Sequence, residues 1–285
     1  MNPRRRPLRI LALILVMTGL AITASQLFRP LRDAEGFFVP SPGEAARAQQ
    51  RFAAALAGEG GAPEGLQAGP FEGAGGVIAL VEKEEDCRGR GSYLLRPEAE
   101  LPLALVAPHR GSDRNTGRLA ELLFAEMPAA AAAWNSAPRR AGADCPGGDP
   151  VRHETHYLTA FSLGFAERHP EGRIVQLHGF ERSRRESSAA QLAQMIVSAG
   201  TEEPDVALFG LADCLSIGFA PSVVAVYPND VAELGALTNR QGQALRERGF
   251  TGFVHLEISA ELRSRLVRDA ELRGRLATCL AEGLR

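Results

Sequence analysis

The 285-residue chain is poor in aromatic side chains and in lysine. Phe, Tyr and Trp together make up 6% of it, so a folded core must rest on Ala, Leu, Val and Ile. Lys83 is the only lysine, which leaves arginine as the cation for any anion-binding site, and its planar guanidinium suits carboxylates. The net charge is −2 and no basic block follows the N-terminus, so we do not expect nucleic acid as a partner.

Several catalytic and cofactor-binding motifs are also missing. The chain has no Gly-x-Ser-x-Gly motif, which disfavours a serine esterase of the α/β-hydrolase type. It has no phosphate-binding loop and no Gly-x-Gly-x-x-Gly turn after a strand. Its four cysteines form no Cys-x-x-Cys pair, which argues against a zinc ribbon or a thioredoxin-type site.

The first thirty residues have the features of an export signal. Four arginines precede an almost continuous apolar run over residues 10–20. Residues 1–30 are therefore predicted to be a signal peptide cleaved after Ala24. The alternative is an uncleaved anchor, because the apolar stretch can be extended to Phe28. Both readings predict a periplasmic protein, free or anchored to the inner membrane, that meets the membrane only through this segment.

The cysteines fit an exported protein, because disulfides persist in oxidising compartments. Four cysteines allow three connectivities, of which we favour Cys87–Cys145 with Cys214–Cys279. Cys87 lies in an expected hairpin turn and Cys145 in a loop rich in Gly and Pro, where a surface bridge is tolerated. Cys279 lies in the expected closing helix, which needs tying to the domain because chain ends fray.

Strands and helices alternate over most of the chain. Residues 31–74 are predicted to be a linker or stalk, punctuated by Pro and Gly, with a short helix over 43–56 that begins after Ser41. The compact domain is predicted over residues 75–285. Its alternating elements predict a three-layer α/β/α fold with a mixed, largely parallel central sheet. Strands are expected at 77–81, 93–95, 101–107, 173–177, 206–209, 223–227 and 252–258, and helices at 117–126, 155–168, 188–199, 238–248 and 260–283.

Two histidines close expected strands, the position where open α/β sheets bind ligands. His109 follows the strand at 101–107, and His178 ends the strand at 173–177. Asp113 lies in the loop after His109, so His109, Asp113 and His178 plus a water are a candidate three-ligand zinc set with an open position. The alternatives are structural histidines and a helix-capping role for Asp113.

The late strand around 252–258 carries a further polar pair. Period-two alternation places His255 and Glu257 on one face and apolar residues on the other. A carboxylate is costly to bury without a partner. A zinc-bound water would provide one, with Glu257 as its general base and His255 as a supporting or alternative ligand. The alternative is a salt bridge from Glu257 to an arginine.

Two other polar groups are candidates for the site. Asn135 and Arg139 follow an alanine run and could clamp a substrate carboxylate, or belong to a solvated loop. Asp149, His153 and His156 form a competing group, because the two histidines lie three residues apart and could share a helix face. His153 could instead orient a ligand through a hydrogen bond.

The order of these segments resembles the zinc carboxypeptidase-like superfamily. It looks closest to the branch that holds N-formylglutamate amidohydrolases and poly-γ-glutamate hydrolases, over about residues 75–284. One departure concerns the first motif, since carboxypeptidases proper have a glutamate where this chain has Ser112. The residues that carry the resemblance are APHRGSD (107–113), NSAPRR (135–140), QLHGF (176–180) and HLEISAELR (255–263).

The resemblance implies a fold and a chemistry. It implies that His109, Asp113 and His178 hold zinc and that Glu257 is the general base. The expected activity is that of an exported zinc-dependent amidohydrolase or peptidase, which cleaves an amide bond in a small molecule or peptide that bears a carboxylate. Because fold does not fix function, the alternative is a non-catalytic ligand-binding or envelope-scaffold protein on the same fold.

Overall fold

A computed structural model describes residues 34–71, 75–83, 85–142 and 144–284, all within one compact unit that begins at Ala34. The predicted signal peptide or anchor over residues 1–30 lies outside the described residues. No helix among those described combines the length and the apolar character needed to cross a membrane.

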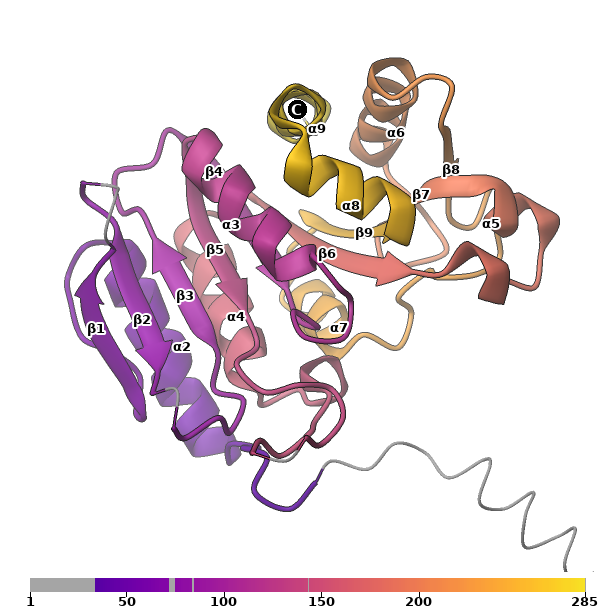
Figure 1. Ribbon diagram of the computed structural model, residues 1–285. Helices are drawn as coiled ribbons and strands as arrows, with labels where there is room; N and C mark the ends of the chain where they lie inside the picture. Colours follow the sequence, from indigo (N-terminus) through magenta and orange to yellow (C-terminus); the bar gives the residue numbers. More distant parts are fainter. Residues whose placement is uncertain (1–33, 72–74, 84, 143, 285) are drawn as a thin grey trace, which may run out of the picture. The chain divides into compact units, whose positions relative to one another are not determined.

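A mixed sheet forms the centre of the unit (Figure 1). Within the described residues, nine strands pair in the order β1-β2-β3-β5-β4-β6-β9-β7-β8. Four of the eight neighbouring pairs are parallel, and three of these join β5, β4, β6 and β9 in the middle of the sheet. The strands are β1 (Leu66–Pro70), β2 (Ile78–Glu82), β3 (Ser92–Leu95), β4 (Leu101–Ala107), β5 (Ala129–Trp134), β6 (Arg173–Phe180), β7 (Ala193–Ser198), β8 (Val223–Val226) and β9 (Phe253–Ser259).

Helices cover both faces of this sheet, which confirms the predicted three-layer α/β fold (Figure 1). The core on one face is built with α3 (Thr116–Glu126), α6 (Val206–Gly218), α8 (Ala260–Arg268) and α9 (Ala270–Glu282). The core on the other face is built with α2 (Pro42–Leu56), α4 (Tyr157–Arg168) and α7 (Arg240–Glu247). The apolar run of β4 is buried between the two helix layers, as expected for a central strand.

The predicted stalk over residues 31–74 is wrong for its described part. Helix α2 begins after Ser41 as predicted, with a capping box between Ser41 and Glu44. It packs on α4 and buries the ring of Phe52, whose centroid lies 4.5 Å from that of Tyr93. Strand β1 adds an antiparallel strand to β2. Helix α2 has an apolar face that packs in the core. The sequence analysis gave more weight to the Pro and Gly residues around the helix and therefore predicted a stalk.

Three other expectations fail for local reasons. The helix predicted at 188–199 ends at Leu192 (α5, Ser188–Leu192) and continues as β7, whose Ile196 and Val197 favour a strand. The strand predicted at 206–209 is the first turn of α6 instead, capped by the Asp205 side chain. The closing helix is broken at Asp269, which caps α9.

Strand β5 is absent from the sequence-based prediction. All of its residues are buried, and five of its six are alanines. Alanine favours helices and is depleted in strands, so its intrinsic preference gives no strand signal. The place between β3 and β4 in the sheet decides its conformation.

Both predicted disulfides are confirmed. Cys87–Cys145 and Cys214–Cys279 each join Cα atoms 5.5 Å apart. The first ties the β2–β3 connection to the loop between β5 and α4, and the second ties α6 to α9. The two bridges therefore fasten different regions of the unit.

Candidate metal centre

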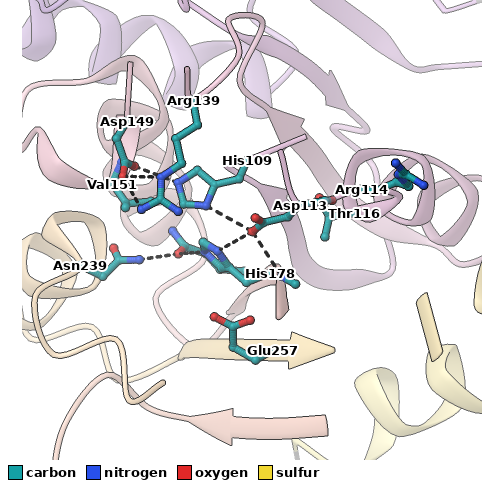
Figure 2. Close-up of polar contacts among 12 residues, drawn as sticks. His109, Asp113, Arg114, Thr116, Arg139, Asp149, Val151, His178, Asn239 and Glu257 are labelled. Carbon is teal, nitrogen blue, oxygen red and sulfur yellow. Dashed lines mark hydrogen bonds and ion pairs between the residues drawn. The ribbon is translucent and has the colours of Figure 1, made fainter. Parts of the chain in front are cut away.

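Three neighbouring parallel strands, β4, β6 and β9, bring their carboxyl ends to one edge of the sheet. His109 follows β4, while His178 and Glu257 are register partners near the ends of β6 and β9. Asp113 comes from the turn after His109, where its backbone N–H donates to the carbonyl of His109 at 2.8 Å. This turn folds the chain back, so that the Asp113 carboxylate faces both histidines (Figure 2).

The three predicted ligand residues lie together. Oδ2 of Asp113 is 3.3 Å from Nδ1 of His109 and 3.3 Å from Nδ1 of His178. Two ligand atoms of a tetrahedral zinc ion, each about 2.0–2.1 Å from the metal, lie roughly 3.3–3.4 Å apart. The distances around Asp113 therefore fit the edges of such a tetrahedron, and both imidazoles are buried.

Hydrogen bonds on the far side of each ring fix which nitrogen faces Asp113. Nε2 of His109 lies 2.8 Å from Oδ1 of Asp149, and Nε2 of His178 lies 3.3 Å from Oε1 of Gln176. Both oxygens only accept, so each Nε2 donates its hydrogen and each neutral ring turns the lone pair of Nδ1 toward Asp113. Three electron-pair donors thus converge on one point, which fits a metal cation.

The pKa shifts of Asp113, His109 and His178 indicate that this group of side chains attracts positive charge. Burial raises the pKa of Asp113, but His109 and His178, whose Nδ1 atoms donate to the carboxylate whenever they carry a proton, outweigh it and hold that pKa well below its usual range. Burial lowers the pKa of His109, but its hydrogen bonds to Asp113 and Asp149 outweigh it and raise that pKa. For His178, burial prevails and lowers the pKa despite the bond to Asp113. The Asp113 carboxylate therefore stays ionised and attracts a cation.

Glu257 lies beside this group with a strongly shifted pKa. Burial, reinforced by the charge of Asp113, raises the pKa of Glu257 to about 8. Its Oε1 atom is 3.7 Å from Nε2 of His255, and its Oε2 atom has no hydrogen-bond partner among the described residues. A carboxyl group with a pKa near neutrality and an unsatisfied oxygen is suited to exchange a proton with a bound reactant.

A second set of possible ligands shares His178. Ligand atoms of His178, His255 and Glu257 also lie within 4.8 Å of one another. In that set, however, Nδ1 of His178 is already turned toward Asp113. Burial and the neighbouring His178 lower the pKa of His255 well below its usual value, so this imidazole is neutral. The set that contains Asp113 has the better-directed donors.

Arg139, Asn135 and His153, which were also predicted as site residues, have different contacts. Arg139 donates to Asp149 from Nε at 2.9 Å and from Nη2 at 2.8 Å, so it supports the His109 side of the site (Figure 2). Asn135 is buried at the end of β5 and donates to the carbonyl of Ala137. The ring of His153 lies against Phe37, with centroids 6.0 Å apart, and His153 belongs to neither set of metal-ligating side chains found in the described ranges.

Three residues of the site were not predicted. Oε1 of Gln176 accepts from Nδ2 of Asn239 at 2.7 Å, in addition to its contact with His178. The Arg263 guanidinium packs on Gly179 and leaves no room there for a Cβ atom. The charge of Arg263 opposes the rise in the pKa of Glu257. Gln176 and Arg263 lie in segments that carry the family resemblance but were assigned no role, while Asn239 gave no signal.

Comparisons with known proteins find similar solved structures but no family. No family model and no curated protein matches the chain. Among the solved structures similar to it are proteins described as carboxypeptidases and metallopeptidases. The similar structures also include a bacteriophage poly-γ-glutamate hydrolase (14% identity, TM-score 0.41, covering 65% of this chain and 84% of that chain). An aspartoacylase family protein from Mesorhizobium loti has 12% identity and a TM-score of 0.42, covering 77% and 72%. A metallo-carboxypeptidase from Burkholderia cenocepacia has 12% identity and a TM-score of 0.41, covering 81% and 68%.

Proposed function

We propose that this chain is an exported zinc-dependent hydrolase that cleaves an amide bond in a carboxylate-bearing small molecule or peptide. The observation that carries the proposal is the convergence of three donor atoms, 3.3 Å apart around Asp113, beside a buried glutamate whose pKa is raised to about 8. A buried carboxyl group is normally paired, so a buried glutamate with an unpaired oxygen beside convergent donor atoms marks a candidate functional site.

His109, Asp113 and His178 would hold the metal. Two imidazole nitrogens and one carboxylate oxygen are a donor set that zinc accepts, with a position left for water or substrate. When bound, zinc supplies Lewis acidity and lowers the pKa of a coordinated water toward neutrality. Asp149 and Gln176 would keep the two imidazoles in the tautomer that binds through Nδ1.

Glu257 would move the proton. Its Oε2 atom, which lacks a partner among the residues described, would accept a proton from the attacking water and return it to the leaving nitrogen. Burial makes this carboxylate more basic than a solvated glutamate, which favours proton uptake near neutral pH. Arg263 limits that rise and so keeps part of the population ionised.

Arg139 is the proposed anchor for the substrate carboxylate. Its side chain is one-third exposed, and Asp149 holds it beside His109 through Nε and Nη2. The remaining hydrogens of the guanidinium can donate to a carboxylate of the substrate. Asn135 at the neighbouring strand end cannot bind that carboxylate through Oδ1, which only accepts; this atom has no partner in the described part of the chain and could accept from an N–H group of the substrate.

Export is proposed on two grounds. The first thirty residues have the composition of a signal peptide or anchor. All four cysteines are paired in two disulfides, a pairing that persists in an oxidising compartment such as the periplasm.

The proposed function is tested with purified protein and a panel of N-acyl amino acids, cell-wall peptides and γ-glutamyl peptides. Zinc-loaded wild type should hydrolyse at least one of them, and chelator-treated protein should not. Glu257→Gln is nearly isosteric and should keep zinc while losing about 10²–10⁴-fold in turnover. Bound zinc without turnover on any compound would contradict hydrolysis and favour a ligand-binding role.

A further inference from the structure

Each histidine of the site is connected through Nε2 to the capping residue of a helical segment. On one side, Asp149 caps the short 3-10 segment η2 (Pro150–Arg152) and accepts directly from His109. On the other side, Asn239 caps α7, and a glutamine stands between it and His178. The first connection is the familiar carboxylate–histidine pair. The second is unusual, because a neutral chain of two amides replaces the carboxylate.

The donor and acceptor roles in this chain are fixed from its far end. Backbone N–H groups can only donate, and those of Gln241 and Gly242 donate to Oδ1 of Asn239 at 3.0 and 3.1 Å. Nδ2 of Asn239 must therefore face Gln176, which it contacts at 2.7 Å. An amide nitrogen requires an acceptor, so Gln176 presents Oε1.

The same donor and acceptor assignment determines the tautomer of His178, the proposed metal ligand. Because Gln176 presents Oε1, Nε2 of His178 is the ring nitrogen that donates, across 3.3 Å. Nδ1 of His178 is then the nitrogen with a lone pair, and it is the atom that faces Asp113. The other end of Gln176 is hydrogen-bonded as well, since its Nε2 donates to Oε1 of Gln241.

We propose that Asn239 is a positioning residue that sets the tautomer of His178 and thereby the affinity of the metal centre. The inference rests on the proposed zinc site. Gln176, Asn239 and Gln241 are all buried, so water does not compete for their hydrogen bonds. Asn239 approaches His178 from the side opposite Asp113 and touches none of the proposed ligands itself (Figure 2).

Loss of the Asn239 donor removes one of the two hydrogen bonds that hold the Gln176 amide. The other bond does not prevent rotation, because Nε2 of Gln241 has no partner among the described residues and the two amides can turn over together. Gln176 then donates to Nε2 of His178, which moves the ring hydrogen to Nδ1. That hydrogen would point at Asp113 and occupy the place of the metal. Metal binding must then work against the wrong tautomer. Removal of such outer hydrogen bonds typically costs about 10–100-fold in metal affinity.

The test replaces Asn239 by serine. Serine is also a good helix cap and is neutral, but it is too short to donate to Gln176. Zinc affinity is measured by competition with a chelator, and the tautomer of His178 in metal-free protein by the ¹⁵N shifts of its ring. Asp205→Ser, at the cap of α6, is the matched control for cap exchange. Thermal unfolding establishes that each variant is folded.

We expect Asn239→Ser to bind zinc about 10–100-fold more weakly and to populate the Nδ1–H tautomer, with Asp205→Ser like wild type. Equal zinc affinity in wild type and Asn239→Ser would overturn the inference and leave the zinc site standing. Weaker binding with an unchanged tautomer would also overturn it, since the effect would then be structural. Wild type that binds no zinc would overturn the proposed function itself, and this inference with it.

Discussion

The two histidines of the site are supported by groups of opposite electrical character. His109 donates to Asp149, a carboxylate that also binds Arg139 and Arg152 in the loop before α4. His178 donates to Gln176, a neutral amide within the buried strand β6. The first support is ionic and reaches partly exposed arginines, while the second is neutral and buried.

This difference would let the proposed site bind a cation and still keep a basic glutamate. Asp149 makes His109 the stronger electron donor, as the raised pKa of His109 indicates. A carboxylate in place of Gln176 would add a negative charge on β6, the strand paired with β9, and would raise the pKa of Glu257 further by repulsion. The neutral amide of Gln176 adds no such negative charge, and Glu257 keeps a pKa of about 8.

The largest expected effect is on zinc binding, and it distinguishes the ligand set that contains Asp113 from the set that contains His255. Asp113→Ala removes the atom at which both Nδ1 nitrogens converge, so zinc binding should fall by more than the roughly 10–100-fold typical of outer hydrogen bonds. His255→Gln should retain zinc, because His255 belongs only to the alternative set. Equilibrium dialysis of both variants measures this. Retention in Asp113→Ala with loss in His255→Gln would move the metal to the other set.

The next prediction compares the two disulfides. Cys87–Cys145 lies near the proposed site and Cys214–Cys279 is remote from it. By chain entropy, closing loops of 58 and 65 residues stabilises the fold by about 4 kcal/mol each. Removing Cys87–Cys145 with a pair of serines should also weaken zinc binding, because that bridge anchors the loop that carries Arg139 and Asp149.

The matched control is the serine pair at Cys214 and Cys279. It should lower the free energy of unfolding by a similar amount and leave zinc affinity unchanged, since that bridge joins α6 to α9. Urea unfolding and chelator competition provide the two readouts. Equal zinc affinity in both double variants would show that the loop does not depend on its bridge.

Asp149→Asn gives His109 the neutral kind of support that His178 has. The acceptor remains but its charge is lost, so we expect about 10–100-fold weaker zinc binding. The pKa of His109 in metal-free protein should fall, because a hydrogen bond to a carboxylate contributes to its rise. NMR titration of His109 checks the direction. An unchanged pKa and affinity would remove the charge of Asp149 from the account.

The last prediction concerns the pH dependence of metal-free stability. The pKa of Glu257 rises from 4.5 to about 8 on folding, so between these values the folded chain holds a proton that the unfolded chain has released. Wild-type stability should therefore fall relative to Glu257→Gln as pH rises through this window, by at most about 1.4 kcal/mol per pH unit. Urea unfolding of both proteins at a series of pH values measures the difference, and a constant difference would contradict the burial of Glu257 as a neutral acid.

Much of the site could be predicted because its residues follow local rules. His109 follows the apolar strand β4, His178 lies near the end of the apolar strand β6, and alternation along β9 places Glu257 on the polar face. The short distance between His109 and Asp113 along the chain made their contact foreseeable.

The parts that escaped prediction depend on contacts between distant residues. Asn239 reaches Gln176 across 63 positions of the sequence, and only the packing of α7 against the core brings them together. Strand β5 has the composition of a helix and becomes a strand because β3 and β4 flank it. Pro and Gly around α2 suggested a stalk, although Phe52 fits against Tyr93 in the core.

The most direct measurement is the zinc content of the purified chain, with and without its two histidine ligands. Wild type, exposed to zinc and then dialysed, should hold one zinc ion per chain, and His109→Ala/His178→Ala should hold none while remaining folded. X-ray absorption should find imidazole nitrogen and carboxylate oxygen at about 2.0–2.2 Å from the bound metal. Wild type without zinc, or a double variant with its full zinc content, would contradict the account.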